Sequence, residues 1–253
     1  MSNSKIALVT GASRGLGKDM ALSIAQKGLD VILTYKSNTE RAEQVVQEII
    51  DIGQQAVAMQ LDITNFNHFG TFMENVHELT ENKFGRTGID YLINNAGIGI
   101  NAPFQETTEE QLDSMINIQF KGTYLFTQAA LKILKEGGGI INISTGLTRF
   151  SGPGFSAYAS MKGAIETLTR YQAKELGVKN IRSNVVAPGA IETDFGGGVV
   201  RDNETMNKTI ASLTALGRVG LPEDIGSVVA FLCTDDAHWI NAQRIEVSGG
   251  QMI

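Results

Sequence analysis

The chain has 253 residues, 42% of them hydrophobic, and a formal net charge of −6. This length and apolar fraction suit one globular α/β domain, and the acidic balance argues against nucleic acid as a partner. Cys233 alone cannot form an internal disulfide, and His68, His77 and His238 lack metal-ligand spacing, so we expect no functional metal. The polar start Met1–Lys5 and the lack of a long apolar run predict a cytoplasmic protein without membrane contact.

Short β-branched segments alternate with longer amphipathic segments along the chain, the pattern of βαβ units that form a parallel sheet. We expect strands at Ile6–Thr10, Val31–Tyr35, Ala56–Gln60, Tyr91–Asn94, Ile140–Ser144, Asn184–Ala187 and Arg244–Val247. We expect helices at Leu16–Lys27, Thr39–Ile52, Phe66–Phe84, Gln111–Lys135, Ser156–Leu176 and Pro222–Cys233. The segment Phe195–Leu216, which contains three consecutive glycines, is either a solvated loop with a short helix or a mobile lid over a substrate cleft.

A glycine-rich turn follows the first expected strand and leads into a helix. It reads Thr10-Gly11-Ala12-Ser13-Arg14-Gly15-Leu16-Gly17. Glycines adopt backbone angles that are closed to other residues and let the chain approach a ligand closely. The helix that follows offers N–H groups and the positive end of its dipole to an anion. This context predicts a site for the diphosphate of a dinucleotide.

The turn and three later motifs together resemble the short-chain dehydrogenase/reductase family. The later motifs are Asn94-Asn95-Ala96-Gly97, Tyr158-Ala159-Ser160-Met161-Lys162 and Pro188-Gly189, and the matching stretch extends from about Lys5 to Ser248-Gly249-Gly250. The resemblance implies one Rossmann-type domain over residues 1–253, a doubly wound parallel sheet of seven strands with helices on both faces. The cofactor half would cover about residues 1–150 and the catalytic and substrate half about residues 151–253. It also implies a homo-oligomer, with a tetramer favoured over a dimer.

The end of the second expected strand favours NADP(H) over NAD(H). In dinucleotide-binding folds an acidic residue at this place holds the ribose 2′-hydroxyl, whereas a cation accommodates a 2′-phosphate. The strand ends Thr34-Tyr35-Lys36-Ser37 without a carboxylate, and Asp30 precedes it, at the opposite end of the sheet. Arg14 and Lys36 are expected to flank the phosphate, with a hydrogen bond from Ser37.

The resemblance implies further contacts with the cofactor. It places Asp62 and Ile63 at the adenine, Asn95, Ala96 and Gly97 at the adenosine ribose, and Pro188, Gly189, Ile191 and Thr193 at the nicotinamide.

Tyr158 and Lys162 are four residues apart in an expected helix, so their side chains share one face. A free tyrosine has a pKa of about 10 and is a poor base at neutral pH, but a nearby ammonium stabilises its phenolate. We therefore expect Tyr158 to transfer the proton and Lys162 to activate it and to hold the cofactor ribose.

The family also uses a hydroxyl on the fifth strand to polarise the substrate carbonyl. Its usual interval of thirteen residues before the tyrosine selects Thr145, and Ser144 is the alternative, since adjacent strand residues point to opposite faces. The asparagine that holds a relay water in the family is replaced here by Gln119, while Asn117 lies two residues earlier and faces elsewhere on a helix.

These residues predict hydride transfer between a nicotinamide and a carbonyl carbon, with proton transfer by Tyr158. The segment Pro188–Asp194 resembles ketoacyl-carrier-protein reductases, so the expected substrate is a ketone, a β-keto ester or a 3-oxoacyl group. Two alternatives are an NAD-dependent sugar or polyol dehydrogenase and a regulatory protein that binds a dinucleotide without turnover.

Overall fold

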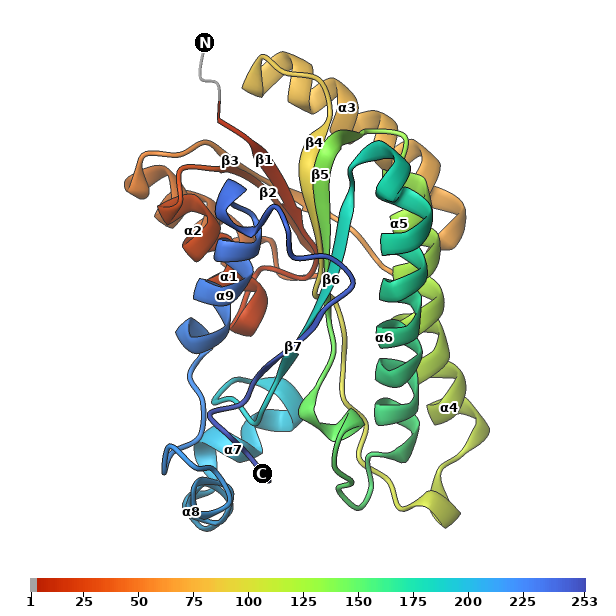
Figure 1. The fold of residues 1–253 in the computed structure, drawn as a ribbon, viewed down its shortest axis with the longest axis vertical. Coiled ribbons are helices and arrows are strands. Elements are labelled where there is room, and N and C mark those ends of the chain that lie inside the picture. The colour runs from red at the N-terminus through yellow and green to blue at the C-terminus, as the bar shows by residue number, and fades with distance from the viewer. Residues whose placement is uncertain (1–3) are drawn as a thin grey trace.

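The computed structural model describes residues 4–253, so Met1–Asn3 of the polar start lie outside the described residues. The described chain forms one parallel sheet of seven strands with helices on both faces (Figure 1). The order of the strands across the sheet is β3-β2-β1-β4-β5-β6-β7. Their bounds are β1 Ile6–Val9, β2 Asp30–Tyr35, β3 Ala56–Gln60, β4 Ile89–Asn94, β5 Leu134–Ile143, β6 Arg182–Pro188 and β7 Arg244–Val247. The predicted doubly wound α/β fold is confirmed.

The central strands are continuously buried because helices cover both faces of the sheet. Every residue of β1, β4 and β6 is buried. Strands buried on both faces lose the alternation of polar and apolar residues that one-sided strands show. This is why β1, with the sequence Ile-Ala-Leu-Val, is an unbroken apolar run in the sequence, whereas β4 and β6 also bury polar residues such as Asn94 and Asn184.

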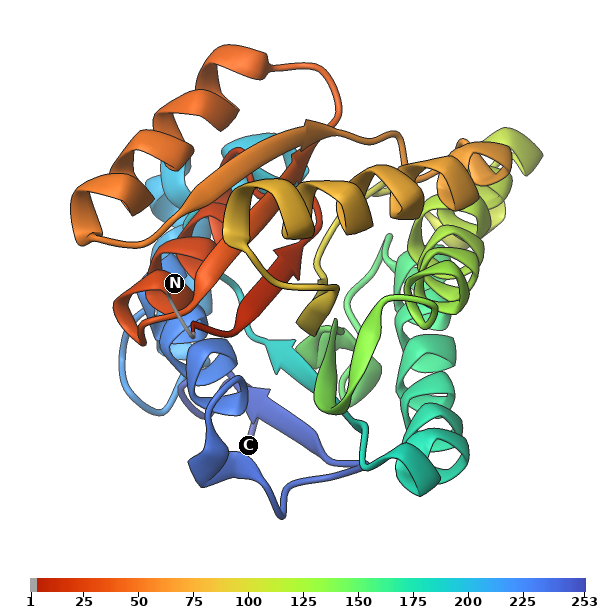
Figure 2. The ribbon, with the colours of Figure 1, turned by 90° about the horizontal axis from the view of Figure 1, so that it is seen from above.

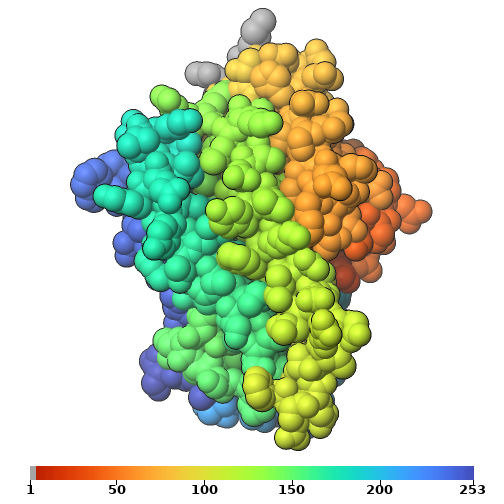
Figure 3. Space-filling view, turned by 90° about the vertical axis from the view of Figure 1, so that its right-hand side faces the viewer, coloured from red at the N-terminus to blue at the C-terminus, as the bar shows by residue number. Residues whose placement is uncertain are grey.

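Two layers of helices pack on the sheet, one on each face (Figure 2). The first layer holds α1 (Gly15–Gln26), α2 (Thr39–Ile52) and α9 (Pro222–Leu232), which share one apolar core with the sheet. The second holds α3 (Phe69–Phe84), α5 (Thr123–Ala130) and α6 (Ser156–Leu176), which lie side by side in Figure 3. The ring of Phe126 packs edge-on against Phe69 at a centroid distance of 5.2 Å, which joins α5 to α3.

The long helix expected at Gln111–Lys135 is wrong in its extent. The segment consists of α4 (Glu109–Met115), a π-helical stretch Ile116–Gly122 and α5, and the following strand β5 already begins at Leu134. Gly137 has a φ of 78°, and a Cβ on Gly138 would lie 2.3 Å from the carbonyl oxygen of Asp90. The helix ends at Ala130 because the chain pairs with β4 from Leu134 onward, and the two glycines let the following residues of β5 approach β4 closely.

The segment after β6 is helical rather than a plain loop. Phe195–Gly198 forms a short 3₁₀ turn, followed by α7 (Val199–Asp202) and α8 (Glu204–Ser212). Gly196 and Gly197 have φ values of 61° and 80°, a left-handed conformation that favours glycine. Figure 1 places α7 and α8 at the carboxyl end of the sheet. The alternative of a mobile lid stays a prediction.

The order of the strands reverses between β1 and β4, which are neighbours in the sheet. In open parallel sheets, ligands bind outside the carboxyl ends of the strands at such a switch point. The glycine-rich turn follows β1, and Asn95-Ala96-Gly97 follows β4, so both motifs meet at this point. Asp30 pairs with Ile6 at the amino ends of β2 and β1, away from this edge.

No helix within residues 4–253 combines the length and hydropathy needed to cross a bilayer. The same residues contain no grouping of three or more histidine, cysteine or acidic side chains suited to a metal ion.

Candidate active site

The glycine-rich turn after β1 is shaped by glycines at three positions. Gly11 and Gly15 have φ values of 65° and 55°. A Cβ on Gly17 would lie 2.4 Å from the carbonyl oxygen of Gly11, so a side chain there would break the turn. Helix α1 begins at Gly15 with Arg14 as its N-cap, and within the described chain no side chain caps it and no acidic residue occupies its first turn. The helix start is therefore suited to an anion.

Hydrogen bonds attach this turn to the end of β4. The hydroxyl of Thr10 accepts the backbone N–H groups of Asn95 and Ala96, each at 3.0 Å. The side-chain amide of Asn95 donates to the carbonyl oxygens of Thr10 and Gly11 at 2.9 and 3.1 Å. Asn95 and Ala96 are therefore fixed beside the glycine turn, as the cofactor prediction requires.

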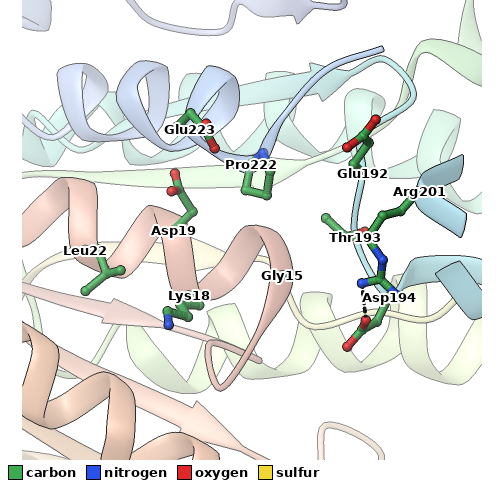
Figure 4. Close-up of a pocket in the computed structure, with 10 residues that line it drawn as sticks. All are labelled: Gly15, Lys18, Asp19, Leu22, Glu192, Thr193, Asp194, Arg201, Pro222 and Glu223. Atoms are coloured by element: carbon green, nitrogen blue, oxygen red, sulfur yellow. Dashed lines mark hydrogen bonds and ion pairs between the residues drawn. The ribbon is translucent and has the colours of Figure 1, made fainter. Parts of the chain in front are cut away.

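A cavity of about 330 Å³ opens beside the start of α1 (Figure 4). Gly15 and Lys18 of α1 line one side, and Thr193, Asp194 and Arg201 face them from the segment after β6. The cavity is also lined by Asp19, Leu22, Glu192, Pro222 and Glu223. Its end near Asp19 is acidic, so an anionic group suits the end near Gly15 and Arg201 better.

Asp194 accepts hydrogen bonds from arginines of three different elements. The distances are 3.3 Å to Nη1 of Arg14, 3.5 Å to Nη1 of Arg41 and 2.6 Å to Nη1 of Arg201. The hydrogen bond from Arg201 lowers the pKa of Asp194. Arg14, Lys18 and Arg41 also line a hollow of about 190 Å³ beside Ser13. A cluster of cations thus lies next to the glycine turn, where it could bind phosphate.

Lys36 does not join this cluster but pairs with Asp62. Its Nζ lies 2.9 Å from Oδ2 of Asp62. Burial acts to raise the pKa of Asp62, but hydrogen bonds from Lys36 and Thr64 outweigh it and lower the pKa to about 2. The Tyr35 hydroxyl accepts a hydrogen bond from Thr39 at 3.3 Å. The structure therefore groups Lys36 with the expected adenine residue and leaves Ser37 exposed.

Tyr158 and Lys162 lie buried on one face of α6, with exposed fractions of 7% and 6%. Nζ of Lys162 donates to the carbonyl oxygen of Ile143 at 2.8 Å and lies 5.7 Å from the centroid of the Tyr158 ring. Burial raises the pKa of Tyr158, against which a hydrogen bond with Thr145 acts. Burial also lowers the pKa of Lys162 to about 8. Tyr158 is thus protonated near neutral pH, and Lys162 is mostly charged.

The structure separates the two candidate hydroxyls after β5. The Thr145 side chain acts to lower the pKa of Tyr158, against the larger effect of burial, and its Oγ1 accepts the N–H of Leu147 at 3.3 Å. Ser144 is turned to the other side, where its Oγ donates to Oε1 of Glu166 at 2.7 Å. Only Thr145 of this pair therefore meets the tyrosine.

Gln119 is 1% exposed, in the π-helical stretch. Its Nε2 donates to the carbonyl oxygen of Ile98, and a Cβ on Gly97 would lie 2.8 Å from its Oε1. This Oε1 is buried and has no hydrogen-bond partner among the described residues. A free acceptor therefore lies directly behind Gly97, where it could bind a water or a ligand.

The remaining expected cofactor residues border the same edge of the sheet. Pro188 ends β6 and pairs with Val247, and Gly189 donates its N–H to the carbonyl oxygen of Val247 at 3.0 Å. Ile191 forms an isolated bridge with Gly220. A Cβ on Gly15 would lie 3.7 Å from Cβ of Thr193, so this segment runs across the start of α1.

Phe195 closes the site from the side of α7. Its ring centroid lies 5.7 Å from that of Tyr158, and a Cβ on Gly99 would lie 2.6 Å from its Cζ. Phe195 is nevertheless 45% exposed. An exposed aromatic ring therefore borders the tyrosine.

A family profile described as enoyl-(acyl carrier protein) reductase matches residues 11–252. A hydroxynaphthalene reductase-like protein of Metarhizium anisopliae is 36% identical over 259 residues, which cover 98% of this chain and 95% of the relative. The chain belongs to the short-chain dehydrogenase/reductase family. The predicted family is thereby confirmed, and the protein is an oxidoreductase.

Two solved structures of reductases are similar to this one. The promiscuous reductase LugOII, which catalyses keto-reduction at C1 during lugdunomycin biosynthesis, is 35% identical with a TM-score of 0.92 and coverage of 98% of this chain and 97% of that one. The angucycline C-6 ketoreductase LanV with bound NADP is 33% identical with a TM-score of 0.92, over 98% of this chain and 95% of that one.

Sequence reasoning missed two features of this short-chain dehydrogenase/reductase. Arg41 lies in the first turn of α2, five residues after Lys36, and only the folding of that turn brings it to Asp194. Glu166 lies eight residues after Tyr158 on α6, a helical spacing that would have placed it on the same face.

The burial of Lys162 has a measurable consequence for stability. Its pKa falls from an ordinary value of 10.5 to about 8 in the fold. Between these values the unfolded chain binds more protons, so stability rises with pH. Relative to that of the Lys162→Met variant, the free energy of unfolding of the wild-type protein should rise by about 2 kcal/mol between pH 7 and 9.5, at 1.36 kcal/mol per pKa unit. Urea unfolding at both pH values measures this difference, and an equal pH dependence of the two proteins would refute it.

Proposed function

We propose that this protein reduces a ketone to a secondary alcohol with NADPH, in a reversible reaction. The observation that carries the proposal is the buried pair of Tyr158 and Lys162 with the half-buried Thr145 beside it, at the carboxyl edge of the sheet. The relatives support it, since LugOII and LanV are both described by the reduction of a ketone. The buried Gln119 Oε1 and the uncapped start of α1 suit a dinucleotide at this place.

Each residue of the group has a distinct role in the proposal. NADPH, when bound, supplies the hydride. Tyr158 donates its hydroxyl proton to the substrate oxygen, and its raised pKa keeps that proton available at neutral pH. Thr145 donates a hydrogen bond to the same oxygen as negative charge develops on it. The Lys162 ammonium stabilises the phenolate that remains, and Gln119 holds a water that returns the proton.

The preference for NADPH rests in this proposal on cations beside the glycine turn. Arg14 and Arg41 are assigned to the 2′-phosphate, because both line the hollow next to Ser13. Lys36 and Ser37 border the adenosine from the end of β2, where the Lys36–Asp62 ion pair limits the charge that Lys36 can offer. The remaining contacts follow the sequence prediction: the N–H groups of the glycine turn at the diphosphate, and the stretch from Pro188 to Thr193 at the nicotinamide.

We expect NADPH to be preferred over NADH by at least about tenfold in kcat/KM, which is about 1.4 kcal/mol. Arg41→Ala should raise KM for NADPH about tenfold and leave KM for NADH unchanged, because only NADPH carries the 2′-phosphate. Arg170→Ala removes an exposed arginine of α6 and is the matched control. Steady-state kinetics with both cofactors measure these values. Equal use of both cofactors by the wild-type protein would contradict the assignment.

The substrate class that we favour is a ketone on a fused aromatic ring. The exposed ring of Phe195 beside Tyr158 suits stacking on a planar substrate, and Ile98 adds apolar surface, with 41% of it exposed. The naming of a hydroxynaphthalene reductase-like relative supports the same class. A 3-oxoacyl group or β-keto ester is the second candidate, since Pro188–Asp194 resembles the ketoacyl-carrier-protein reductases.

A panel of fused-ring ketones, β-keto esters, sugars and polyols, assayed with both cofactors, tests this choice. Turnover of ketones with NADPH supports the proposal. Oxidation of polyols with NAD as the main activity would favour the dehydrogenase alternative, and tight binding of NADPH without any turnover would favour the regulatory one. Light scattering on the same preparation tests the homo-oligomer, for which a tetramer is favoured.

A further inference from the structure

One face of α6 contacts the end of β5 at three successive points. Tyr158, Lys162 and Glu166 are spaced by four residues, so their side chains share this face. Tyr158 meets Thr145, Lys162 donates to the carbonyl oxygen of Ile143, and Glu166 accepts from the hydroxyl of Ser144. The first two contacts belong to the proposed reaction, and the third has no part in it.

Glu166 is held by a partly buried set of donors. Its Oε1 lies 2.7 Å from Oγ of Ser144, 2.7 Å from Oγ1 of Thr148 and 2.8 Å from Nε of Arg244. The side chain of Glu166 is only 14% exposed and that of Arg244 is 25% exposed. Water screens such a pair less than an ion pair on the surface, and its hydrogen bonds fix the geometry of the groups around it.

Arg244 extends this contact directly to the backbone of Thr145. Its Nη2 donates to the carbonyl oxygen of Thr145 at 3.3 Å and to Oγ1 of Thr148 at 3.1 Å. Its Nη1 donates to Glu246 at 2.9 Å, and Glu246 in turn binds Arg149 at 2.7 Å. The residue that bears the proposed catalytic hydroxyl is therefore bound on its far side by charged groups of α6 and β7.

We propose that Glu166 and Arg244 are positioning residues that fix Thr145 against Tyr158. The inference rests on the proposed function, in which the Thr145 hydroxyl polarises the substrate carbonyl. Thr145 lies just beyond the end of β5, at the start of the short 3₁₀ turn Gly146–Thr148, so the sheet alone does not fix it. A displacement of about 1 Å in a reacting group can cost about a hundredfold in rate, which makes such support valuable.

A double-mutant cycle on Glu166 and Thr145 tests the inference. Glu166→Gln keeps the size of the side chain and removes its charge, so kcat should fall about tenfold while the Kd for NADPH, measured by fluorescence, stays unchanged. In a Thr145→Val background the same change should cost less than about twofold, because the hydroxyl that Glu166 positions is already absent. Asp235→Asn, which breaks the ion pair of Asp235 with Lys5 next to the amino end of β1, is the matched control and should leave kcat unchanged.

Arg244→Lys gives a second, milder variant if Glu166→Gln fails to fold. A lysine keeps the cation beside Glu166 but loses the planar fork that also reaches Thr145, so kcat should fall about threefold to fivefold with unchanged NADPH binding. An equal loss from Glu166→Gln in both backgrounds, or no loss in either, would overturn the inference while the effect of Thr145→Val remained. If Thr145→Val alone left kcat unchanged, the proposed role of the threonine would fail, and the positioning role with it.

Discussion

Tyr158→Phe is expected to lower kcat/KM for ketone reduction by about 10⁴-fold and to leave NADPH binding nearly unchanged. The substitution keeps the buried ring and its packing against Phe195 and removes only the hydroxyl. General acid–base help contributes about 10² to 10⁴ in rate, and a residue that also orients the carbonyl belongs at the upper end of that range. Steady-state kinetics and a fluorescence titration with NADPH measure the two quantities.

Tyr171→Phe is the matched control, because Tyr171 lies on the same helix with 63% of its surface exposed. It should keep full activity. If Tyr158→Phe retained more than about a tenth of the wild-type kcat/KM, a loss under about 1.4 kcal/mol, then Tyr158 could not be the proton donor.

Thr145→Val should lower kcat by about a hundredfold, the usual loss for one donor to a developing oxyanion. Valine has nearly the shape of threonine, so the fold and the KM for NADPH should change little. Ser144→Ala should cost much less, because the Ser144 hydroxyl donates to Glu166 and is turned away from Tyr158.

The order of these two effects distinguishes the hydroxyls. Kinetics of both variants with one ketone and saturating NADPH suffice to measure it. A larger loss from Ser144→Ala than from Thr145→Val would mean that the serine, and not the threonine, binds the substrate oxygen.

The central strands of the sheet could be predicted from the sequence because they are buried on both faces. The runs Ile6–Val9 and Val31–Leu33 are short and apolar, and the edge strand Arg244–Val247 shows instead an alternation of charged and apolar residues. The helix expected at Gln111–Lys135 failed at its end because periodicity cannot detect that Leu134 already pairs with Ile89 in the sheet. Nor does periodicity distinguish a π-helical stretch, which alters the spacing around Gln119.

The motifs of the site were predictable, but their partners were not. Sequence spacing alone left Thr145 and Ser144 both open, and the direction of each side chain at the end of β5 separates them. The ion pair of Lys36 with Asp62 and the approach of Arg41 to Asp194 join residues 26 and 153 positions apart, counted from 36 to 62 and from 41 to 194. Such contacts depend on how the loops fold at the sheet edge, which no local pattern encodes.

Transfer of deuterium from NADPH that carries deuterium at both C4 positions of the nicotinamide tests the central claim most directly. The wild-type protein is incubated with labelled NADPH and a fused-ring ketone, and the product is analysed by mass spectrometry and NMR. We predict one deuterium on the new carbinol carbon, and no labelled product from Tyr158→Phe under the same conditions. Binding of NADPH without label transfer to any ketone of the panel would contradict the assignment as a ketone reductase.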